Sequence, residues 1–314
     1  MFKWNKKGMI FSPDRYSEWM YSHAQCPFTY DFGDYIRIYF STREAYIEGM
    51  SKAYGGWVDV DRKDMKKILN IADQPVLELG QIGEFDEFGS MPNSIVKVGD
   101  EFYLYFCGWT RAVSTPYCWE IGLAKGTDGK TFNKVGKGPI IGPTMEEPYL
   151  HACPQVYILD GVWHMFYLSG QRWIQGNEKM ESQYLIVHAT SGDGIKWNRN
   201  PNPIIESKVE YESQTSAAII KMNNKFHMFF CYRYGLDFRK SDGRGYTLGY
   251  AYSEDLMNWK RDDSQVGISL SEDGWDSKMI AYPHIAQIDG KYYMFYCGND
   301  FGKDGFGYAE LEIV

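Results

Sequence analysis

The segment CPQVYILDGVWHMFYLS, residues 153–169, combines an apolar strand, a tight Asp-Gly turn and an aromatic strand that ends in a small residue. The pattern occurs five times, and the other copies are CPFTYDFGDYIRIYFS (26–41), MPNSIVKVGDEFYLYFC (91–107), SAAIIKMNNKFHMFFC (216–231) and YPHIAQIDGKYYMFYC (282–297). Successive copies end 66, 62, 62 and 66 residues apart, which is long enough for four strands and their connections. This period predicts an all-β chain with one propeller blade per repeat, a five-bladed β-propeller.

Further strands follow each hairpin. A third strand is predicted in four repeats, at 121–125, 185–190, 248–253 and 306–310, and a fourth in the inner repeats, at 132–141, 197–205 and 259–268. The last repeat has no fourth strand of its own before Val314. Residues 4–11, WNKKGMIF, match the fourth-strand pattern that starts at Phe132, so the N-terminal strand is expected to complete the last blade and close the ring. Residues 1–314 are therefore expected to form a single domain.

The amino-acid composition narrows the classes of molecule that the protein is expected to bind. The net charge of −8 offers no electrostatic footprint for nucleic acid or for an anionic membrane surface. No apolar run is long enough for a signal peptide or a membrane span, so we expect a cytoplasmic protein. Aromatic residues make up 17% of the chain, which suits strand-rich cores and also suits the stacking of sugar rings. Carbohydrate is the expected partner, and no cofactor is expected.

The cysteines are interpreted as structural thiols. Cys107, Cys231 and Cys297 end the aromatic strands of their repeats, and Cys26 and Cys153 directly precede the proline of theirs. Free cysteine at such apolar positions is usually buried. The chain has no C-x-x-C pair, so no metal site is expected.

Carboxylates recur at one position of the repeat. Asp86, Glu147, Glu212 and Asp276 each lie five to seven residues before the position of the repeat's proline. Segments that enter the innermost strands of a propeller converge on a central channel, so we expect these acids to share one pocket. Glycoside hydrolysis needs two carboxyl groups, one protonated and one ionised, and crowding drives their pKa values apart. The four are the predicted catalytic acids; the alternative is that they cap strand-entry turns.

Six other residues near the inner strands are candidates for substrate binding: His23, Arg43, Trp109, His151, Arg172 and Arg233. The two histidines lie three or four residues before a repeat proline and either reach a central ligand or are structural. The three arginines follow aromatic strands and could bind a uronate, sialate or phosphate group, or pair with the acids. The tryptophan is either a stacking platform for sugar or a packing residue.

With these motifs the chain resembles, over essentially its full length, the five-bladed propeller glycosidases, especially glycosyl hydrolases related to glycoside hydrolase family 43. The segments that carry the resemblance are SHAQCP (22–27), RIYFSTRE (37–44), GSMPNS (89–94), WHMFYLSG (163–170), GYAYSED (249–255) and WDSKMIAYP (275–283). The resemblance implies a propeller glycosidase with Asp86 tuning a pKa and Glu147 as the acid, and it leaves the base open between Glu212 and Asp276. The chain departs from family 43 in the first blade, where His23 and Gln25 stand in place of an aspartate, and in the third, where Ala152 precedes Cys153 and the acid is displaced.

Three functions follow from this reading. The first is hydrolysis of a glycosidic bond by the carboxylates. The second is phosphorolysis, in which phosphate replaces the attacking water, only one protein carboxylate is needed, and Arg43, Arg172, Arg233 and His151 would bind the phosphate. The third is a propeller that binds carbohydrate without catalysis.

Overall fold

The protein is described by a computed structural model that covers residues 1–46 and 51–312. The described chain is all-β, as the repeat predicts: apart from a 3-10 turn at Asp263–Gln265 and the four-residue helix α1 (Asn299–Gly302), its regular elements are strands. Within the described ranges, no helix is long and apolar enough to cross a bilayer.

The strands form five antiparallel groups, and successive strands within each group are hydrogen-bonded neighbours. Four groups follow the chain order: β2 (Ser22–Asp31), β3 (Tyr35–Arg43), β4 (Ala53–Asp61) and β5 (Ile68–Ile71); β6 (Gly89–Val98), β7 (Glu101–Thr110), β8 (Cys118–Gly126) and β9 (Asn133–Lys134); β10 (His151–Leu159), β11 (Val162–Gln175), β12 (Met180–Ser191) and β13 (Asn198–Asn200); β14 (Ser213–Met222), β15 (Lys225–Arg233), β16 (Thr247–Ser253) and β17 (Lys260–Arg261). The fifth group contains β18 (Ala281–Ile288), β19 (Lys291–Cys297), β20 (Phe306–Leu311) and the N-terminal strand β1 (Trp4–Phe11).

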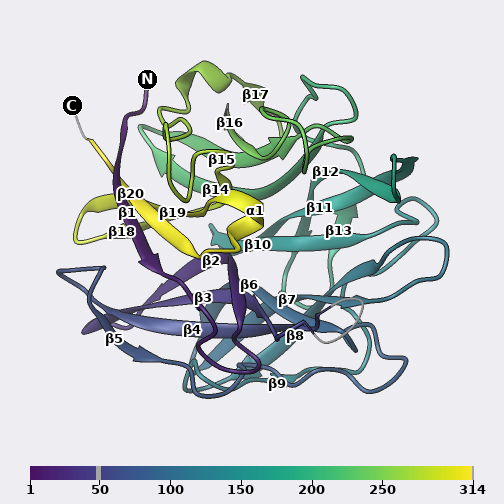
Figure 1. Cartoon of the computed structure of the whole chain (residues 1–314), viewed down its shortest axis with the longest axis horizontal. Helices are drawn as coiled ribbons and strands as arrows, with labels where there is room; N and C mark the ends of the chain where they lie inside the picture. The colour runs from purple at the N-terminus through teal and green to yellow at the C-terminus, as the bar shows by residue number, and fades with distance from the viewer. Residues whose placement is uncertain (47–50, 313–314) are drawn as a thin grey trace.

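The first strand of each group faces the first strands of its neighbours. β18 contacts β2, β2 contacts β6, β6 contacts β10, β10 contacts β14, and β14 contacts β18. The first two groups also pair at one point, Ala53 opposite Gly89, and therefore form one sheet of eight strands. The inner strands β2 and β10 lie near the middle of the molecule, whereas the short strands β5, β9 and β17 lie toward its edge (Figure 1).

The N-terminal strand lies where its sequence pattern predicts. β1 pairs antiparallel with β20, in a register that runs from Trp4 opposite Leu311 to Phe11 opposite Phe306. The two ends of the chain therefore lie side by side (Figure 1). Trp4 and Phe11 are buried, so this strand contributes to the core of the last group and also covers the free edge of β20.

The fourth strands are much shorter than the sequence pattern predicts. Segments 132–141, 197–205 and 259–268 contain only the two- or three-residue strands β9, β13 and β17. Proline cannot donate to a ladder, and Pro139, Pro201 and Pro203 follow the first two of these strands. In the third segment the chain turns into the 3-10 helix instead.

Neighbouring groups are joined by a repeated hydrogen bond from a buried tyrosine. The hydroxyl of Tyr39 donates to the carbonyl of Gly129 at 2.6 Å, and that of Tyr105 donates to the carbonyl of Gly194 at 2.8 Å. Both glycines have positive φ, 65° and 72°. A Cβ added at Gly194 would lie 2.6 Å from the Tyr105 hydroxyl, so only glycine permits this approach.

Candidate functional site

A cavity of about 390 Å³ lies where the inner strands meet, a size typical of small-molecule sites. Each group supplies residues to its lining from the inner strand. These residues are Cys26 on β2, Met91 on β6, Cys153 on β10, Thr215 on β14 and Tyr282 on β18. The cavity is therefore shared by segments that are far apart in the sequence.

A β-bulge in each inner strand aims a residue at this cavity. Pairing between the first and second strands shifts register at the repeat's proline position in all five groups. Cys26, Cys153 and Tyr282 occupy the bulge with positive φ, at 51°, 50° and 54°, and all three line the cavity. Bulges commonly re-aim a side chain next to an active site, and here the repeat places one in every group.

The cysteines are free thiols, as predicted. Cys107, Cys231 and Cys297 are buried, whereas Cys26 and Cys153 are partly exposed in the cavity. The hydrogen bond between the last two raises the pKa of the Cys26 thiol and lowers the pKa of Cys153. In the described part of the chain, no group of three or more His, Cys, Asp or Glu side chains is arranged to hold a metal ion.

The four predicted catalytic acids lie in four similar environments, which the sequence did not predict. None of them lines the cavity, all are buried, and each forms an ion pair with a cation on the fourth strand of its own group. The pairs are Asp86–Lys134 (2.5 Å), Glu147–Arg199 (2.6 Å), Glu212–Arg261 (2.6 Å) and Asp276–Lys6 (2.7 Å). In each of these four groups the pair joins the loop before the inner strand to the outermost strand.

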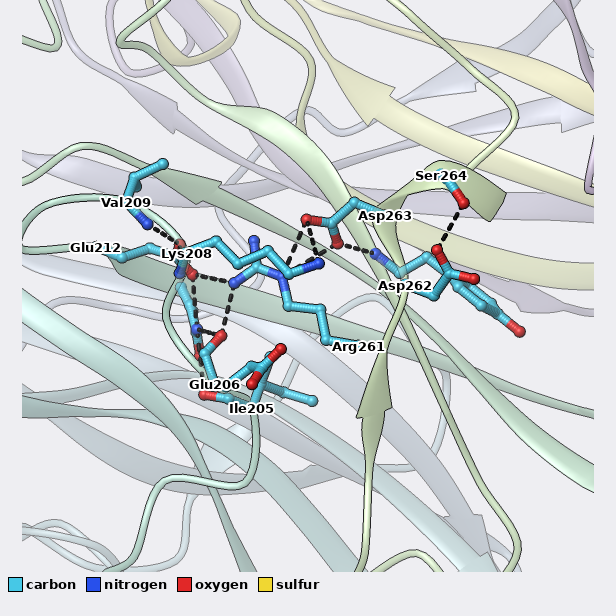
Figure 2. Close-up of polar contacts among 11 residues, drawn as sticks. Ile205, Glu206, Lys208, Val209, Glu212, Arg261, Asp262, Asp263 and Ser264 are labelled. Carbon is cyan, nitrogen blue, oxygen red and sulfur yellow. Dashed lines mark hydrogen bonds and ion pairs between the residues drawn. The ribbon is translucent and has the colours of Figure 1, made fainter.

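Figure 2 shows one such pair in detail. Glu212 accepts hydrogen bonds from Arg261 Nη1, from the side chain of Gln214, and from the backbone N–H groups of Lys208 and Val209. Arg261 also donates to Asp263. A carboxylate with this many donors is held in one orientation.

The ion pair in the third group, Glu147–Arg199, contacts His151, one of the two predicted binding histidines. Glu147 accepts from Arg199 Nε and from the Tyr167 hydroxyl, and Arg199 Nη2 donates to His151 Nε2 at 2.9 Å. His151 is fully buried, and burial together with the charge of Arg199 lowers its pKa to about 4. His151 thus belongs to this polar cluster and not to the cavity lining.

The other predicted binding residues divide into two sets. Arg43, Trp109 and Arg233 line the cavity. His23 and Arg172 do not: the His23 Nδ1 hydrogen-bonds the Ser22 hydroxyl, and Arg172 is exposed, with its guanidinium 5.7 Å from the ring centre of Tyr211. Burial lowers the pKa of His23 to about 3, so its imidazole is neutral at physiological pH.

The sequence reasoning missed an aromatic wall of the cavity. Tyr117 and Trp119 stack with ring centres 4.3 Å apart and an interplanar angle of 14°, and both line the cavity. Tyr184, within β12, and Tyr246, directly before β16, line it from two other groups. A signal was present in the sequence, because all four aromatic residues lie one to four residues before the predicted third strands at 121–125, 185–190 and 248–253.

Two cavity cations were also missed. Arg239 and Lys179 line the cavity beside Arg43 and Arg233, and both lie in segments between strands that the repeat pattern does not constrain. Among the lining residues that the structure describes, four are cationic and none is a carboxylate. The cavity therefore favours ligands that are neutral or anionic.

Comparison with known proteins gives relatives along the whole chain. No protein-family model matches. An uncharacterised protein of Mycobacterium tuberculosis, found in two strains, is 34% identical over 314 residues, which cover 98% of this chain and 99% of that protein. Two enzymes of Thermoanaerobacter sp. (strain X514) are also similar. A β-1,2-mannobiose phosphorylase is 35% identical over 104 residues, 31% of this chain, and a 1,2-β-oligomannan phosphorylase is 23% identical over 256 residues, 79% of this chain and 78% of that protein.

Solved structures with similar folds include glycoside hydrolases. A glycoside hydrolase superposes with a TM-score of 0.77 at 18% identity, covering 99% of this chain and 92% of that one. A thermostable family-43 glycoside hydrolase superposes with a TM-score of 0.60 at 15% identity, covering 93% and 88%. A structure from work on the mannoside phosphorylases and hydrolases of family GH130 has a TM-score of 0.70 at 13% identity, covering 99% and 94%. At these identities the likeness is one of fold.

Proposed function

The chain belongs to the same family as the full-length mycobacterial protein and has the fold of the β-propeller glycosidase superfamily related to glycoside hydrolase family 43, and on this premise we propose that it cleaves a glycosidic bond in its central cavity. The observation that carries the proposal is the cavity itself, where stacked aromatic rings and unpartnered polar atoms from several strand groups converge. Both features suit a sugar, which has apolar ring faces and hydroxyl groups.

The polar atoms of the lining support a saccharide ligand. The Ser41 hydroxyl and the Asn93 Oδ1 are buried in the cavity wall and have no hydrogen-bond partner among the described residues. Buried polar groups are costly to leave unpaired, and sugar hydroxyls both donate and accept. We infer that these two atoms bind hydroxyl groups of a sugar whose ring stacks on Trp119 or Tyr117.

The proposed architecture of the site is one five-bladed ring formed by residues 1–314 as a single domain. Its support is the unbroken circuit of contacts from β2 through β6, β10 and β14 to β18, with β1 completing the group to which β18 belongs. In such a ring all five bulges would face one ligand, which matches the residues that line the cavity.

Hydrolysis is the first reaction to test. It needs two carboxyl groups that reach the ligand, and Asp86, Glu147, Glu212 and Asp276 stay predictions for this role. Their ion pairs give them a competing structural role, in which each fastens a strand-entry loop to the edge of its sheet. Substitution of these acids separates the two roles, as argued below for Glu147.

Phosphorolysis is the second candidate, and the four cations of the cavity lining favour it. In this reaction an oxygen of inorganic phosphate bonds to the anomeric carbon, the glycosidic bond breaks, and the leaving sugar takes up a proton. Two similar enzymes are phosphorylases of β-1,2-linked mannosides.

One experiment distinguishes these reactions. The purified chain is incubated with β-1,2-mannobiose, β-1,2-oligomannan and a panel of other oligosaccharides, with and without inorganic phosphate, and the products are separated by chromatography. Hydrolysis releases free sugars under both conditions. Phosphorolysis releases a sugar 1-phosphate only when phosphate is present. Tight sugar binding with no product in either condition would contradict cleavage and favour a binding protein.

A further inference from the structure

Two guanidinium groups lie in the cavity wall with no carboxylate partner among the described residues. Arg233 is 3% exposed, and its N–H groups donate only to neutral oxygens: the carbonyls of Tyr234 and Ser182 and the hydroxyl of Tyr184. Arg43 donates to the side-chain oxygen of Gln25 at 3.2 Å. Arginine cannot lose its proton in a protein, so both groups remain charged in a low-dielectric wall.

A third arginine adds to this positive charge. Arg239 lines the same cavity and forms an ion pair with Glu181 at 2.5 Å. Arg233 and Arg239 both lie over the ring of Phe238, with their guanidinium carbons 3.6 and 4.1 Å from its centre, so these two cations lie close to each other. These three guanidinium groups thus have one described carboxylate between them. A buried cation without a counterion is costly, and an anionic ligand would offset that cost.

Aromatic rings around Arg233 fix the orientation in which its guanidinium can bind a ligand. Its guanidinium lies 3.6 Å from the ring centre of Phe238, 5.2 Å from that of Tyr184 and 5.7 Å from that of Tyr246. Stacking on these rings holds the planar fork in one orientation. A preoriented fork matches the two oxygens of a carboxylate or phosphate, whereas a lysine at this position would present only a point charge.

We propose that Arg43, Arg233 and Arg239, the cation cluster, bind an anionic group, either a carboxylate or a phosphate, so that the cavity selects acidic saccharides, or a saccharide together with phosphate, over neutral sugar alone. The aromatic wall formed by Tyr117 and Trp119 would hold the sugar ring of the same ligand. This inference rests on the proposed function only in taking the ligand to be a saccharide.

The test measures binding and needs no turnover, so its outcome is independent of whether a glycosidic bond is cleaved. Glucuronate, glucose and inorganic phosphate are titrated separately into the full-length chain by calorimetry, and glucose is titrated again in the presence of phosphate. We expect at least one of the two anions to bind about 10-fold or more tightly than glucose, as charge-assisted hydrogen bonds imply. Tighter binding of glucuronate than of phosphate would show that the anionic group is part of the sugar. Binding of phosphate, with stronger binding of glucose in its presence, assigns it to a separate co-substrate.

Variants of the cation cluster test which side chains bind the anion. Arg233→Met and Arg239→Met should each reduce anion binding about 10-fold or more, and Lys240→Met should leave it unchanged. Lys240 is a matched control because it neighbours Arg239 but is exposed, pairs with Glu178 and does not line the cavity. Arg233 is buried, whereas the side chain of Arg239 is 39% exposed. Arg239→Met therefore keeps the test valid if Arg233→Met does not fold. If neither anion binds more tightly than glucose, or if both folded variants bind anions like the unmodified chain, the proposal is wrong.

Discussion

At the scale of single residues, Glu147 can be either a catalytic acid or half of a structural ion pair, and the two roles have opposite consequences. Its carboxylate is 3% exposed and accepts from Arg199 and Tyr167, and Arg199 has no other described carboxylate partner. Replacing Glu147 with glutamine keeps the shape but leaves this cation without its counterion. Breaking a buried pair in this way costs about 3 kcal/mol.

We therefore expect Glu147→Gln to lower the melting temperature by roughly 5 °C or more, while the folded fraction retains its activity. Thermal unfolding and turnover per folded molecule are measured on the same sample. The matched control is Glu254→Gln, since Glu254 forms an exposed pair with Lys225 and should change stability little. An unchanged melting temperature with lost turnover would reverse the assignment and make Glu147 catalytic.

At the scale of strands and sheets, the sequence predicted the first two strands of every group, because each repeat carries its own hairpin signals, and the third strand of four groups; β4 of the first group was not predicted. The fourth strands were predicted too long, since Pro139 and Pro203 interrupt the ladder, and backbone pairing with the third strand resumes after them only locally, at Ile141 and Ile204. The direction in which the side chains of the four acids point, away from the cavity and toward the fourth strands, could not be predicted at all. A constant distance from the repeat's proline fixes where a residue lies along the chain, not whether its side chain turns toward the cavity or toward the sheet edge.

The partners of those acids nevertheless have a sequence signature. Each cation stands two residues after an aromatic residue at the start of the fourth strand, in Phe132-Asn-Lys, Trp197-Asn-Arg, Trp259-Lys-Arg and Trp4-Asn-Lys. Reading this pattern together with the repeated acids would have indicated ion pairs within each group. The cavity cations Arg239 and Lys179 have no such signature, because the segments that carry them follow no repeat.

The third sheet, β10 to β13, contains two buried histidines that give it a pH dependence. Burial and the charge of Arg199 lower the pKa of His151 to about 4, and burial next to His164 lowers the pKa of His188 to about 4. In the unfolded chain both would titrate near 6.5. The unfolded state therefore binds more protons than the folded state between these values, and stability falls as the pH drops from about 6.5 to about 4.

Each of these histidines contributes at most about 1.4 kcal/mol per pH unit in that window. We expect the free energy of unfolding, measured in urea at pH 7, 6 and 5, to fall across this series. His188→Gln removes one titrating group, so its slope with pH should be shallower by up to one proton, whatever its effect on stability at pH 7. Equal slopes for the variant and the unmodified chain would rule out His188 as a source of the dependence.

At the scale of the whole molecule, stability depends on joining the two ends of the chain. β1 lies antiparallel to β20, with Trp4 opposite Leu311, and Lys6 supplies the cation for Asp276 in the last group. Trp4, Ile10 and Phe11 are buried, and each large apolar side chain contributes about 1.5 to 3 kcal/mol on burial. Deleting residues 1–11 should therefore destabilise the protein by roughly 5 kcal/mol or more and expose the edge of β20.

The antiparallel pairing of β1 with β20 also suggests an experiment that restores the stability lost in this deletion. Because Leu311 faces Trp4, the C-terminal end of β20 lies beside the N-terminal end of β1, the arrangement that a short hairpin connection requires. A permuted chain that lacks residues 1–11 at its start but carries them after Val314 through a short glycine-containing turn should recover most of the lost melting temperature. If the truncated chain melts like the unmodified chain, β1 does not stabilise the group that it forms with β18, β19 and β20. If the truncation unfolds but the permuted chain is not rescued, the loss comes from the altered sequence and not from the missing strand.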